Sequence, residues 1–232
     1  LRDLFDNYGK DKKSGDAAKR AHPLKSLSSD PPRGEKRKQK EAPYLPNKVN
    51  EEEVSVDTLL ADLDALIGLD RVKAEVRDLV NLVYFNQTKT AKGFKTASVS
   101  MHTVFYGSPG TGKTTVARVY GQILKALGLL SKGHVVETDR AGLVANYIGQ
   151  TANKTDEKVR EALGGVLFID EAYSLYTGDE SKWDYGAEAI QVLVKRMEDY
   201  REDLVVIVAG YPEPMNEFLD SNEGFKSRFP RY

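Results

Sequence analysis

The sequence predicts an α/β fold with a doubly wound, mostly parallel sheet, and three observations support that prediction. Segments typical of strands alternate with segments that have the periodicity of amphipathic helices. Two strand segments, 165–169 (GVLFI) and 204–209 (LVVIVA), are apolar throughout, as expected for strands with helices on both faces. A glycine-rich loop of the form GxxxxGK(S/T) at 107–114 joins an expected strand to an expected helix.

The first half of the alternation contains three helices and one strand. Helices are expected at 56–67, 70–84 and 114–127, and a short strand at 102–106. The helix at 70–84 has one apolar stripe with helical spacing, formed by Val72, Val76, Leu79, Val80 and Val83. The helix at 114–127 has a similar face, formed by Val116, Val119, Tyr120, Ile123 and Leu127.

The second half continues the pattern. Strands are expected at 134–138, 165–169 and 204–209, with helices at 153–163 and 185–200 between them. The helix at 185–200 places apolar residues at spacings of 3, 4 and 7, namely Ile190, Leu193, Val194 and Met197.

Composition divides the 232 residues into two parts. Residues 1–50 carry 13 Lys and Arg against 7 Asp and Glu, a net charge of +6, and five of the nine prolines. Residues 51–232 carry 21 against 28, a net charge of −7. We therefore predict a mostly disordered linker at 1–50 and a globular domain at 51–232. The basic run 36–40 fits a targeting or nucleic-acid patch, or a solvated part of the linker, and charge runs are usually solvated.

Several classes of protein are excluded by composition. The formal net charge of −1 gives no general argument for nucleic acid or an anionic membrane as a partner. The absence of Cys excludes a disulfide scaffold, a zinc finger and thiol catalysis. The sequence contains no apolar stretch of membrane-spanning length and shows no signal peptide, so we expect a cytoplasmic protein. Because the chain begins with Leu1 rather than Met, we also expect it to be a piece of something longer.

The loop at 107–114 (GSPGTGKT) predicts a phosphate-binding site. Its glycines allow successive backbone N–H groups to face phosphate oxygens, and the N-terminus of the following helix favours negative charge. Lys113 can reach the β- and γ-phosphates, and the Thr114 hydroxyl can hold Mg²⁺. The alternative is a glycine-rich turn with a chance lysine, which the strand–loop–helix context disfavours. The expected nucleotide-binding residues are Pro109, Gly110, Thr111, Gly112, Lys113, Thr114 and Thr115.

Two carboxylates, Asp170 and Glu171, follow the apolar strand at 165–169. Carboxylates at the end of a buried strand are costly unless they have a role. In a nucleotide site the first holds Mg²⁺ and the second deprotonates the water that attacks the γ-phosphate. A structural alternative is an acidic pair at a helix N-terminus. The phosphate loop upstream favours the catalytic interpretation.

Together with LIGLDRVKAEV (66–76) and GFKSRFPRY (224–232), these motifs resemble those of the AAA+ ATPases. A narrower resemblance, to the group containing red-type Rubisco activase (CbbX/CfxQ), stage V sporulation protein K and the EccA-type secretion ATPases, rests on four segments. These are 133–155, 164–175, 184–215 and 227–229. The resemblance covers about 57–232 and implies an AAA+ nucleotide-binding core with ATP and Mg²⁺ as cofactors.

The resemblance also implies roles for residues outside the phosphate loop. Ile67 and Gly68 match the segment that lies on the adenine, although Gly68 could simply end a helix. Tyr147, Ile148 and Gly149 resemble the pore loop that grips a polypeptide, the alternative being an ordinary tyrosine folded onto the core. A second pore loop would fall at 177–185. Arg228 matches the arginine finger that enters the site of a neighbouring subunit, with Lys226 and Arg231 as less well-placed rivals.

The sequence departs from the family pattern at two places. Where many members have an Asn or Thr that senses the γ-phosphate, Tyr211 is the nearest residue, so the sensor stays open. The chain also stops at Tyr232, where a fifth strand and a helical lid are expected to follow. The implied protein is a ring-forming ATPase, most simply a hexamer, that remodels, threads or disassembles a protein client.

Two other functions fit parts of the sequence. The first is an ATP-dependent assembly switch or scaffold that does not thread a client, as in a secretion- or sporulation-type protein. The second is a ring that acts on nucleic acid, which only the basic run at 36–40 supports. The charge of −7 over 51–232 argues against nucleic acid as a partner.

Overall fold

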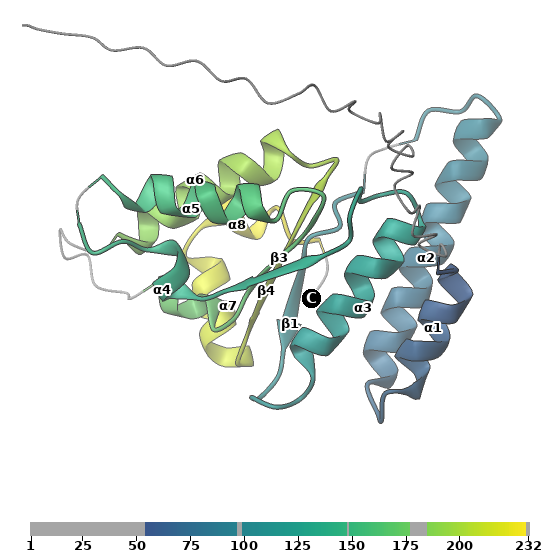
Figure 1. The fold of residues 1–232 in the computed structure, drawn as a ribbon, viewed down its shortest axis with the longest axis horizontal. Helices are drawn as coiled ribbons and strands as arrows, with labels where there is room; N and C mark the ends of the chain where they lie inside the picture. Colours follow the sequence, from purple (N-terminus) through teal and green to yellow (C-terminus); the bar gives the residue numbers. More distant parts are fainter. Residues whose placement is uncertain (1–53, 97–98, 148, 177–184, 231–232) are drawn as a thin grey trace, which may run out of the picture. The chain divides into compact units, whose positions relative to one another are not determined.

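Four parallel strands form the sheet in the computed structural model, which describes residues 54–96, 99–147, 149–176 and 185–230 (Figure 1). They lie in the order β1-β4-β3-β2. Their bounds are β1 Thr103–Tyr106, β2 Val135–Thr138, β3 Gly165–Ile169 and β4 Leu204–Gly210. In the register, Tyr106 lies opposite Gly210, and Ile169 lies opposite both Val208 and Thr138. The carboxyl ends of all four strands therefore meet at one edge of the sheet.

The described residues form helices close to those expected, together with short helices that the hydrophobic pattern did not predict. The elements common to both are α1 Val56–Ala65, α2 Asp70–Ala91, α3 Lys113–Ala126, α5 Thr151–Glu161 and α6 Gly186–Asp199. The additional elements are α4 Arg140–Leu143, the 3-10 helix η1 Ala172–Leu175, α7 Pro212–Asp220 and α8 Glu223–Lys226. These four are 4 to 9 residues long, too short to show a clear apolar period.

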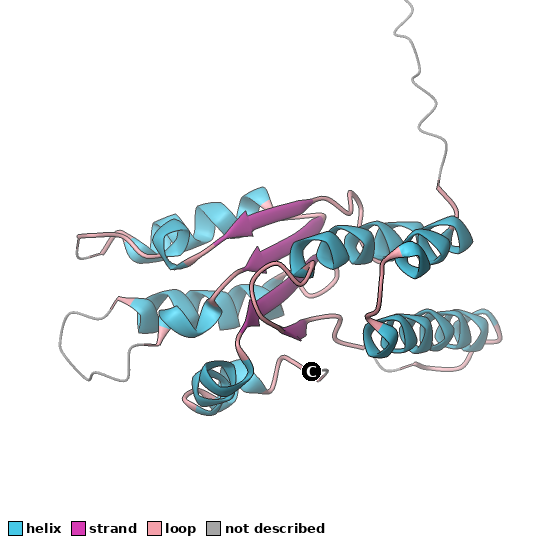
Figure 2. Ribbon diagram, turned by 90° about the horizontal axis from the view of Figure 1, so that it is seen from below, coloured by secondary structure: helices cyan, strands magenta, loops and turns pink. Residues whose placement is uncertain are grey.

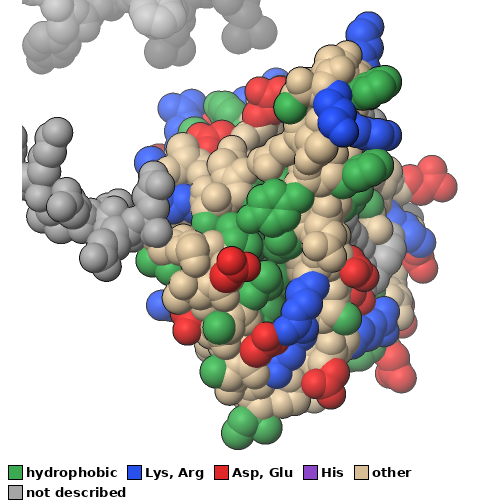
Figure 3. All heavy atoms as spheres, turned by 90° about the vertical axis from the view of Figure 1, so that its right-hand side faces the viewer, with side chains coloured by type: hydrophobic (Ala, Val, Ile, Leu, Met, Phe, Trp, Pro, Cys, Tyr) green, Lys and Arg blue, Asp and Glu red, His purple; other side chains and the backbone are tan. Residues whose placement is uncertain are grey.

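Helix α2 continues seven residues beyond Tyr84, where the expected helix ends. Its C-terminal half is largely exposed, so no apolar stripe marks it, and the helix ends before Gly93, whose φ is +82°. Figure 3 shows this side of the molecule, where hydrophobic side chains reach the surface among charged ones. Phe85 of α2 is exposed, and the Lys89 ammonium lies 4.7 Å from the centre of its ring.

The two faces of the sheet pack against different sets of helices, as Figures 1 and 2 show. Along β3, Val166 and Phe168 pack with α1, α2 and α3, whereas Leu167 and Ile169 pack with residues of α4 to α8. This alternation follows from the period-2 geometry of a strand. The prediction of a doubly wound parallel sheet is therefore confirmed.

The strand order places a topological switch point beside β1. The chain crosses from β1 to the far strand β2 through α3, and then returns through β3 to β4, which lies next to β1. At the carboxyl ends of these neighbouring strands, the Gly107 N–H donates to the Gly210 carbonyl over 3.1 Å. Ligands of open α/β sheets bind in the crevice at such a point.

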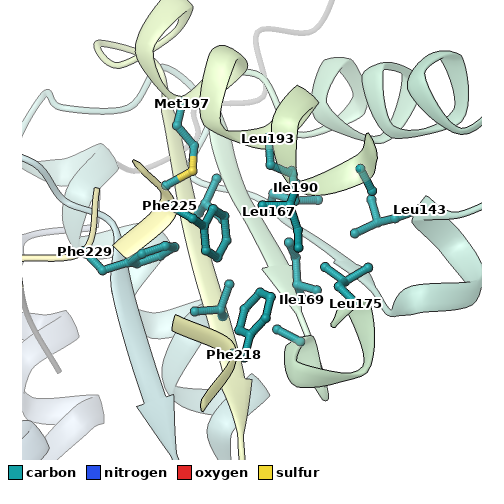
Figure 4. Packing of buried hydrophobic residues seen from close by; sticks show 14 of the residues in the cluster. Leu143, Leu167, Ile169, Leu175, Ile190, Leu193, Met197, Phe218, Phe225 and Phe229 are labelled. Atoms are coloured by element: carbon teal, nitrogen blue, oxygen red, sulfur yellow. The ribbon is translucent and has the colours of Figure 1, made fainter. Parts of the chain in front are cut away.

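An aromatic cluster closes the core under α7 and α8 (Figure 4). The Phe225 ring meets Phe218 and Phe229 edge to face, with centroid distances of 5.3 and 4.9 Å. Phe229 also lies beside His102, whose Nδ1 accepts a hydrogen bond from the Val206 N–H over 2.9 Å. Burial lowers the pKa of His102 to about 4, so this imidazole is neutral at physiological pH and packs as part of the core.

Candidate nucleotide-binding site

The phosphate loop lies between the end of β1 and the start of α3. Gly110 and Gly112 have φ values of +77° and +84°, which a residue with a side chain adopts only with strain. Gly112 is the N-cap of α3, so the first N–H groups of the helix face the loop. The loop therefore has the backbone conformation and the helix N-terminus that phosphate binding requires.

Lys113 and its neighbours lie in and directly after the phosphate loop. The Lys113 ammonium donates to the carbonyls of Gly107 and Ser108 over 3.0 and 3.1 Å, so it lies against the loop itself. The Thr111 hydroxyl donates to Ser108 O over 2.8 Å. Thr114 is half-buried in the first turn of α3. Pro109, Gly110, Thr111 and Thr115 are exposed.

The acidic pair leaves β3 at the same edge of the sheet. The Asp170 N–H donates to Thr138 O over 2.9 Å, and an Asp170 carboxylate oxygen accepts from the Glu171 N–H over 3.1 Å. Both side chains are exposed. Given the register, only β4 separates this pair from the phosphate loop, and two strand spacings amount to about 10 Å. The structure thus brings Asp170, Glu171 and Lys113 together.

Glu171 has an unusual backbone conformation, with φ +48° and ψ +43°. Among the described residues only one other non-glycine residue, Leu69, has a positive φ. The left-handed conformation costs a residue with a side chain about 1–2 kcal/mol. This strained turn redirects the chain immediately after β3 and opens the 3-10 helix η1.

The donor set suits Mg²⁺. The Thr114 hydroxyl and the Asp170 carboxylate are oxygen donors, and Mg²⁺ is usually held by one or two carboxylates together with substrate phosphates. Within the described part of the chain, no group of three or more His, Cys, Asp or Glu could hold a metal by itself. The residues present therefore fit an ion that binds together with a nucleotide.

A cavity of about 440 Å³ extends from the phosphate loop under the inner face of α2. It is lined by Leu69, Arg71, Val72, Glu75, Val76, Leu79, Val104, Phe105, Tyr106, Gly107, Thr111, Lys113, Val116 and Tyr120. A mostly apolar wall next to a phosphate loop is suited to the base and sugar of a nucleotide. The sequence pattern places Val72, Val76 and Leu79 in an apolar stripe and gives no sign that they face the phosphate loop, because their position opposite the loop depends on how α2 packs.

Ile67 and Gly68 do not line this cavity. Ile67 is 98% exposed, and Gly68 has a φ of +70° with open space where a side chain would stand. The neighbouring Leu69 does reach the cavity wall. Contact of Ile67 and Gly68 with adenine stays a prediction.

Arg228 lies at the opposite end of the sheet from the phosphate loop of its own chain. Its carbonyl accepts a hydrogen bond from the Ser100 hydroxyl over 2.9 Å, just before β1, whereas the loop follows β1. The four residues of β1 span about 13 Å. The guanidinium lies 3.4 Å from a Glu198 carboxylate oxygen, with 31% of the side chain exposed. Arg228 and Glu171 are therefore not brought together within one chain.

The expected pore loop lies between α4 and α5. Tyr147 is 71% exposed, so its ring does not fold onto the core, and Gly149 has a φ of +77°. Ile148 and residues 177–184, most of the expected second pore loop, lie outside the described residues. The Lys154 ammonium anchors the base of the loop by donating to Ala141 O and Val144 O over 2.6 and 3.1 Å.

A second cavity of about 590 Å³ lies between α4, η1 and the start of α6. Its wall consists of Asp139, Arg140, Ala141, Val144, Ala145, Asn146, Glu171, Ser174 and Tyr185. Arg140 links two of these elements, because its guanidinium donates to Ser174 O over 2.7 Å. Glu171 therefore faces a space that it shares with the base of the Tyr147 loop.

The fold and the loop define a nucleotide-binding protein of the phosphate-loop class. A family model described as "ATPase family associated with various cellular activities (AAA)" matches residues 103–230, and the chain belongs to this family. The resemblance seen in the sequence is thereby confirmed at the level of the family.

Among curated proteins, the chain is 46% identical over 169 residues to stage V sporulation protein K of Bacillus subtilis. It is 49% identical over 201 residues to the plasmid-encoded protein CbxX of Cupriavidus necator. It is 46% identical over 187 residues to the chloroplastic ribulose bisphosphate carboxylase/oxygenase activase of Cyanidioschyzon merolae. These matches cover 73%, 83% and 78% of the chain, but only 52%, 63% and 64% of the three relatives.

Among solved structures, the AAA domain of FIGL-1 in complex with ADP matches with a TM-score of 0.48 and 22% identity. That match covers 71% of this chain and 52% of the other.

In the described part of the chain, no helix is both long and apolar enough to cross a membrane.

Proposed function

We propose that this chain binds ATP with Mg²⁺ and hydrolyses it at the edge of the sheet where β1, β4 and β3 end. The observation that carries the proposal is the strand register. It sets the phosphate loop and the acidic pair on either side of β4, at a separation of about 10 Å. That spacing leaves room for a γ-phosphate and an attacking water between Lys113 and Glu171.

Each residue has a defined task in this reaction. The loop amides and the Lys113 ammonium bind the β- and γ-phosphates, and Thr114 with Asp170 would hold Mg²⁺. Bound Mg²⁺ would offset negative charge on the phosphates. Glu171 is the group that takes a proton from the attacking water. The cavity beside the loop receives the nucleoside.

The chain acts in an oligomer, most simply a hexameric ring, in which Arg228 completes the site of a neighbour. The position of Arg228 at the far end of β1 supports this assignment, because it cannot serve its own phosphate loop. A guanidinium next to the γ-phosphate stabilises charge that develops in the transition state.

The work of the ring is the remodelling, threading or disassembly of a protein client in the cytoplasm. The exposure of Tyr147 supports a gripping role, because an aromatic ring offers a flat surface to many peptide side chains. The name of one relative, a Rubisco activase, is compatible with action on another protein. An assembly switch without threading is the alternative, and it would not require Tyr147.

Two variants test the site. Glu171→Gln should keep ATP affinity but lower the turnover rate about 10²–10⁴-fold, the usual loss for a general base. Lys113→Ala should weaken the affinity for a non-hydrolysable ATP analogue, because a charge opposite the phosphates is lost. Calorimetry and ATP turnover on the same preparations separate the two effects. Wild-type turnover by Glu171→Gln would refute the assigned base, and unchanged affinity of Lys113→Ala would refute the site.

A further inference from the structure

The left-handed turn at Glu171 is held by contacts on both sides. Before it, Asp170 is tied to β2 through Thr138 O. After it, the Ser174 N–H donates to Glu171 O over 2.8 Å and opens η1. A strained conformation of this kind persists only when its surroundings determine it fully. The contacts of η1 are therefore candidates for holding Glu171 in place.

The ring of Tyr173, in η1, makes such a contact with β4. A Cβ atom built on Gly210 would lie 2.7 Å from Cδ1 of Tyr173, a distance that real Cβ atoms do not adopt. Gly210 has no left-handed φ, so its backbone conformation does not require glycine. The Tyr173 ring and the flexible Met215 side chain, whose Cγ would lie 2.8 Å from the same added Cβ, together occupy the space that a side chain at position 210 would need.

Gly210 also touches the phosphate loop. Its carbonyl accepts the Gly107 N–H over 3.1 Å, so one residue contacts both halves of the site. Its Cα side supports Tyr173, two residues after Glu171, and its carbonyl holds the first residue of the loop. Gly210 therefore lies in contact with both the phosphate loop and the 3-10 helix that follows Glu171.

Tyr173 also has charged and aromatic neighbours at this end of the sheet. Burial raises the pKa of the half-buried Tyr173 phenol, and Glu171, Tyr211 and Asp170 raise it further. The Tyr211 ring lies beside it, with a centroid distance of 6.3 Å and a tilt of 46°. Tyr173 thus lies between the end of β4 and the turn that carries Glu171.

We propose that Tyr173 is a positioning residue for Glu171, acting through the contact of its ring with Gly210. This inference rests on the proposed role of Glu171 as the base. The ring is the active part, because it fills the space above Gly210 whether or not it carries a hydroxyl. Neither Tyr173 nor Gly210 stood out in the sequence, since their contact joins residues 37 positions apart.

The test compares variants of the full chain under saturating ATP. Tyr173→Ala should lower kcat about 10²-fold, the loss that a displacement of about 1 Å can cause. Its affinity for a non-hydrolysable ATP analogue should stay within about twofold, because the loop is unchanged. Tyr173→Phe should restore the wild-type rate. Gly210→Ala should also lower kcat, because the added methyl group displaces the ring.

The double variant supplies a second readout. If the two residues act through one contact, Tyr173→Ala with Gly210→Ala should be no slower than Tyr173→Ala alone. Tyr176→Ala is the matched control, since Tyr176 follows the same 3-10 helix but is 45% exposed, and it should hydrolyse ATP at the wild-type rate. Multiplicative losses in the double variant would overturn the proposal.

Other outcomes separate this proposal from the one on which it rests. Wild-type turnover by Glu171→Gln would refute the assignment of Glu171 as the base, and Tyr173 would then have no catalytic group to position. If Glu171→Gln hydrolyses ATP slowly but Tyr173→Ala hydrolyses it at the wild-type rate, the assignment of Glu171 as the base stands and the positioning role of Tyr173 is overturned. A Tyr173→Phe variant as slow as Tyr173→Ala would overturn the role of the ring. If Tyr173→Ala does not fold, Gly210→Ala and Tyr173→Phe decide by comparison with the wild type. Wild-type turnover by Gly210→Ala, or slow turnover by Tyr173→Phe, would then overturn the proposal.

Discussion

If each ATPase site combines Glu171 of one subunit with Arg228 of its neighbour, two single variants can test that arrangement. Arg228 is held near Ser100 and Glu198, about 13 Å of strand away from the loop of its own chain. Arg228→Ala should therefore bind ATP normally but hydrolyse it about 10³–10⁵-fold more slowly, as expected when an arginine finger is lost. Glu171→Gln alone should also be slow, for the different reason that it lacks the base.

Mixing the two variants should restore activity. In rings assembled at random from equal amounts, about one quarter of the interfaces pair an intact Glu171 with an intact neighbouring Arg228. We therefore expect turnover of roughly a quarter of the wild-type rate, against about one hundredth or less for either variant alone. The assay is steady-state ATP hydrolysis, after light scattering has shown that mixed oligomers form.

A matched control and a refuting result complete this experiment. Arg201 also pairs with Glu198, at 3.5 Å, and its side chain is 57% exposed, so Arg201→Ala should hydrolyse ATP at the wild-type rate. Mixed rings that are no more active than the separate variants would refute sites shared between subunits. The assembly switch would then be the better description of this protein.

Two further predictions concern the client and the packing of α5 on α6. Tyr147→Ala should bind and hydrolyse ATP as the wild type does but lose the unfolding of a labelled casein probe, and full unfolding activity would refute the grip. Burial opposes ionisation of Asp156, but hydrogen bonds and charge from Arg196 and Arg160 lower its pKa overall. Because the pKa of Asp156 is lower in the folded state, its ion pairs stabilise the fold at pH values above the unfolded pKa of about 3.9. This stabilisation is lost as the pH falls through the folded-state pKa. Asp156→Asn should therefore lower Tm by roughly 2–4 °C at pH 7 and by much less near pH 2, and an equal loss at both would refute the ion pairs.

Local patterns in the sequence were sufficient to predict the main elements. The strands at 165–169 and 204–209 were recognised because a strand covered on both faces is apolar throughout. The phosphate loop was recognised because left-handed positions such as Gly110 and Gly112 favour glycine. The length of α2 was underestimated because its last seven residues have no apolar stripe and include weak helix formers such as Asn86, Thr88 and Thr90.

Only the tertiary structure decided which of these elements meet. The order β1-β4-β3-β2 places Glu171 two strands from the phosphate loop, and no local pattern encodes strand order. Packing likewise turns the apolar stripe of α2 into a cavity wall, leaves Ile67 outside it and brings Tyr173 onto Gly210. These contacts join residues far apart in the chain, and they form because each helix must bury its apolar face against the sheet. The sequence by itself therefore determined the chemical groups of the site, and the packing of helices on the sheet determined their geometry.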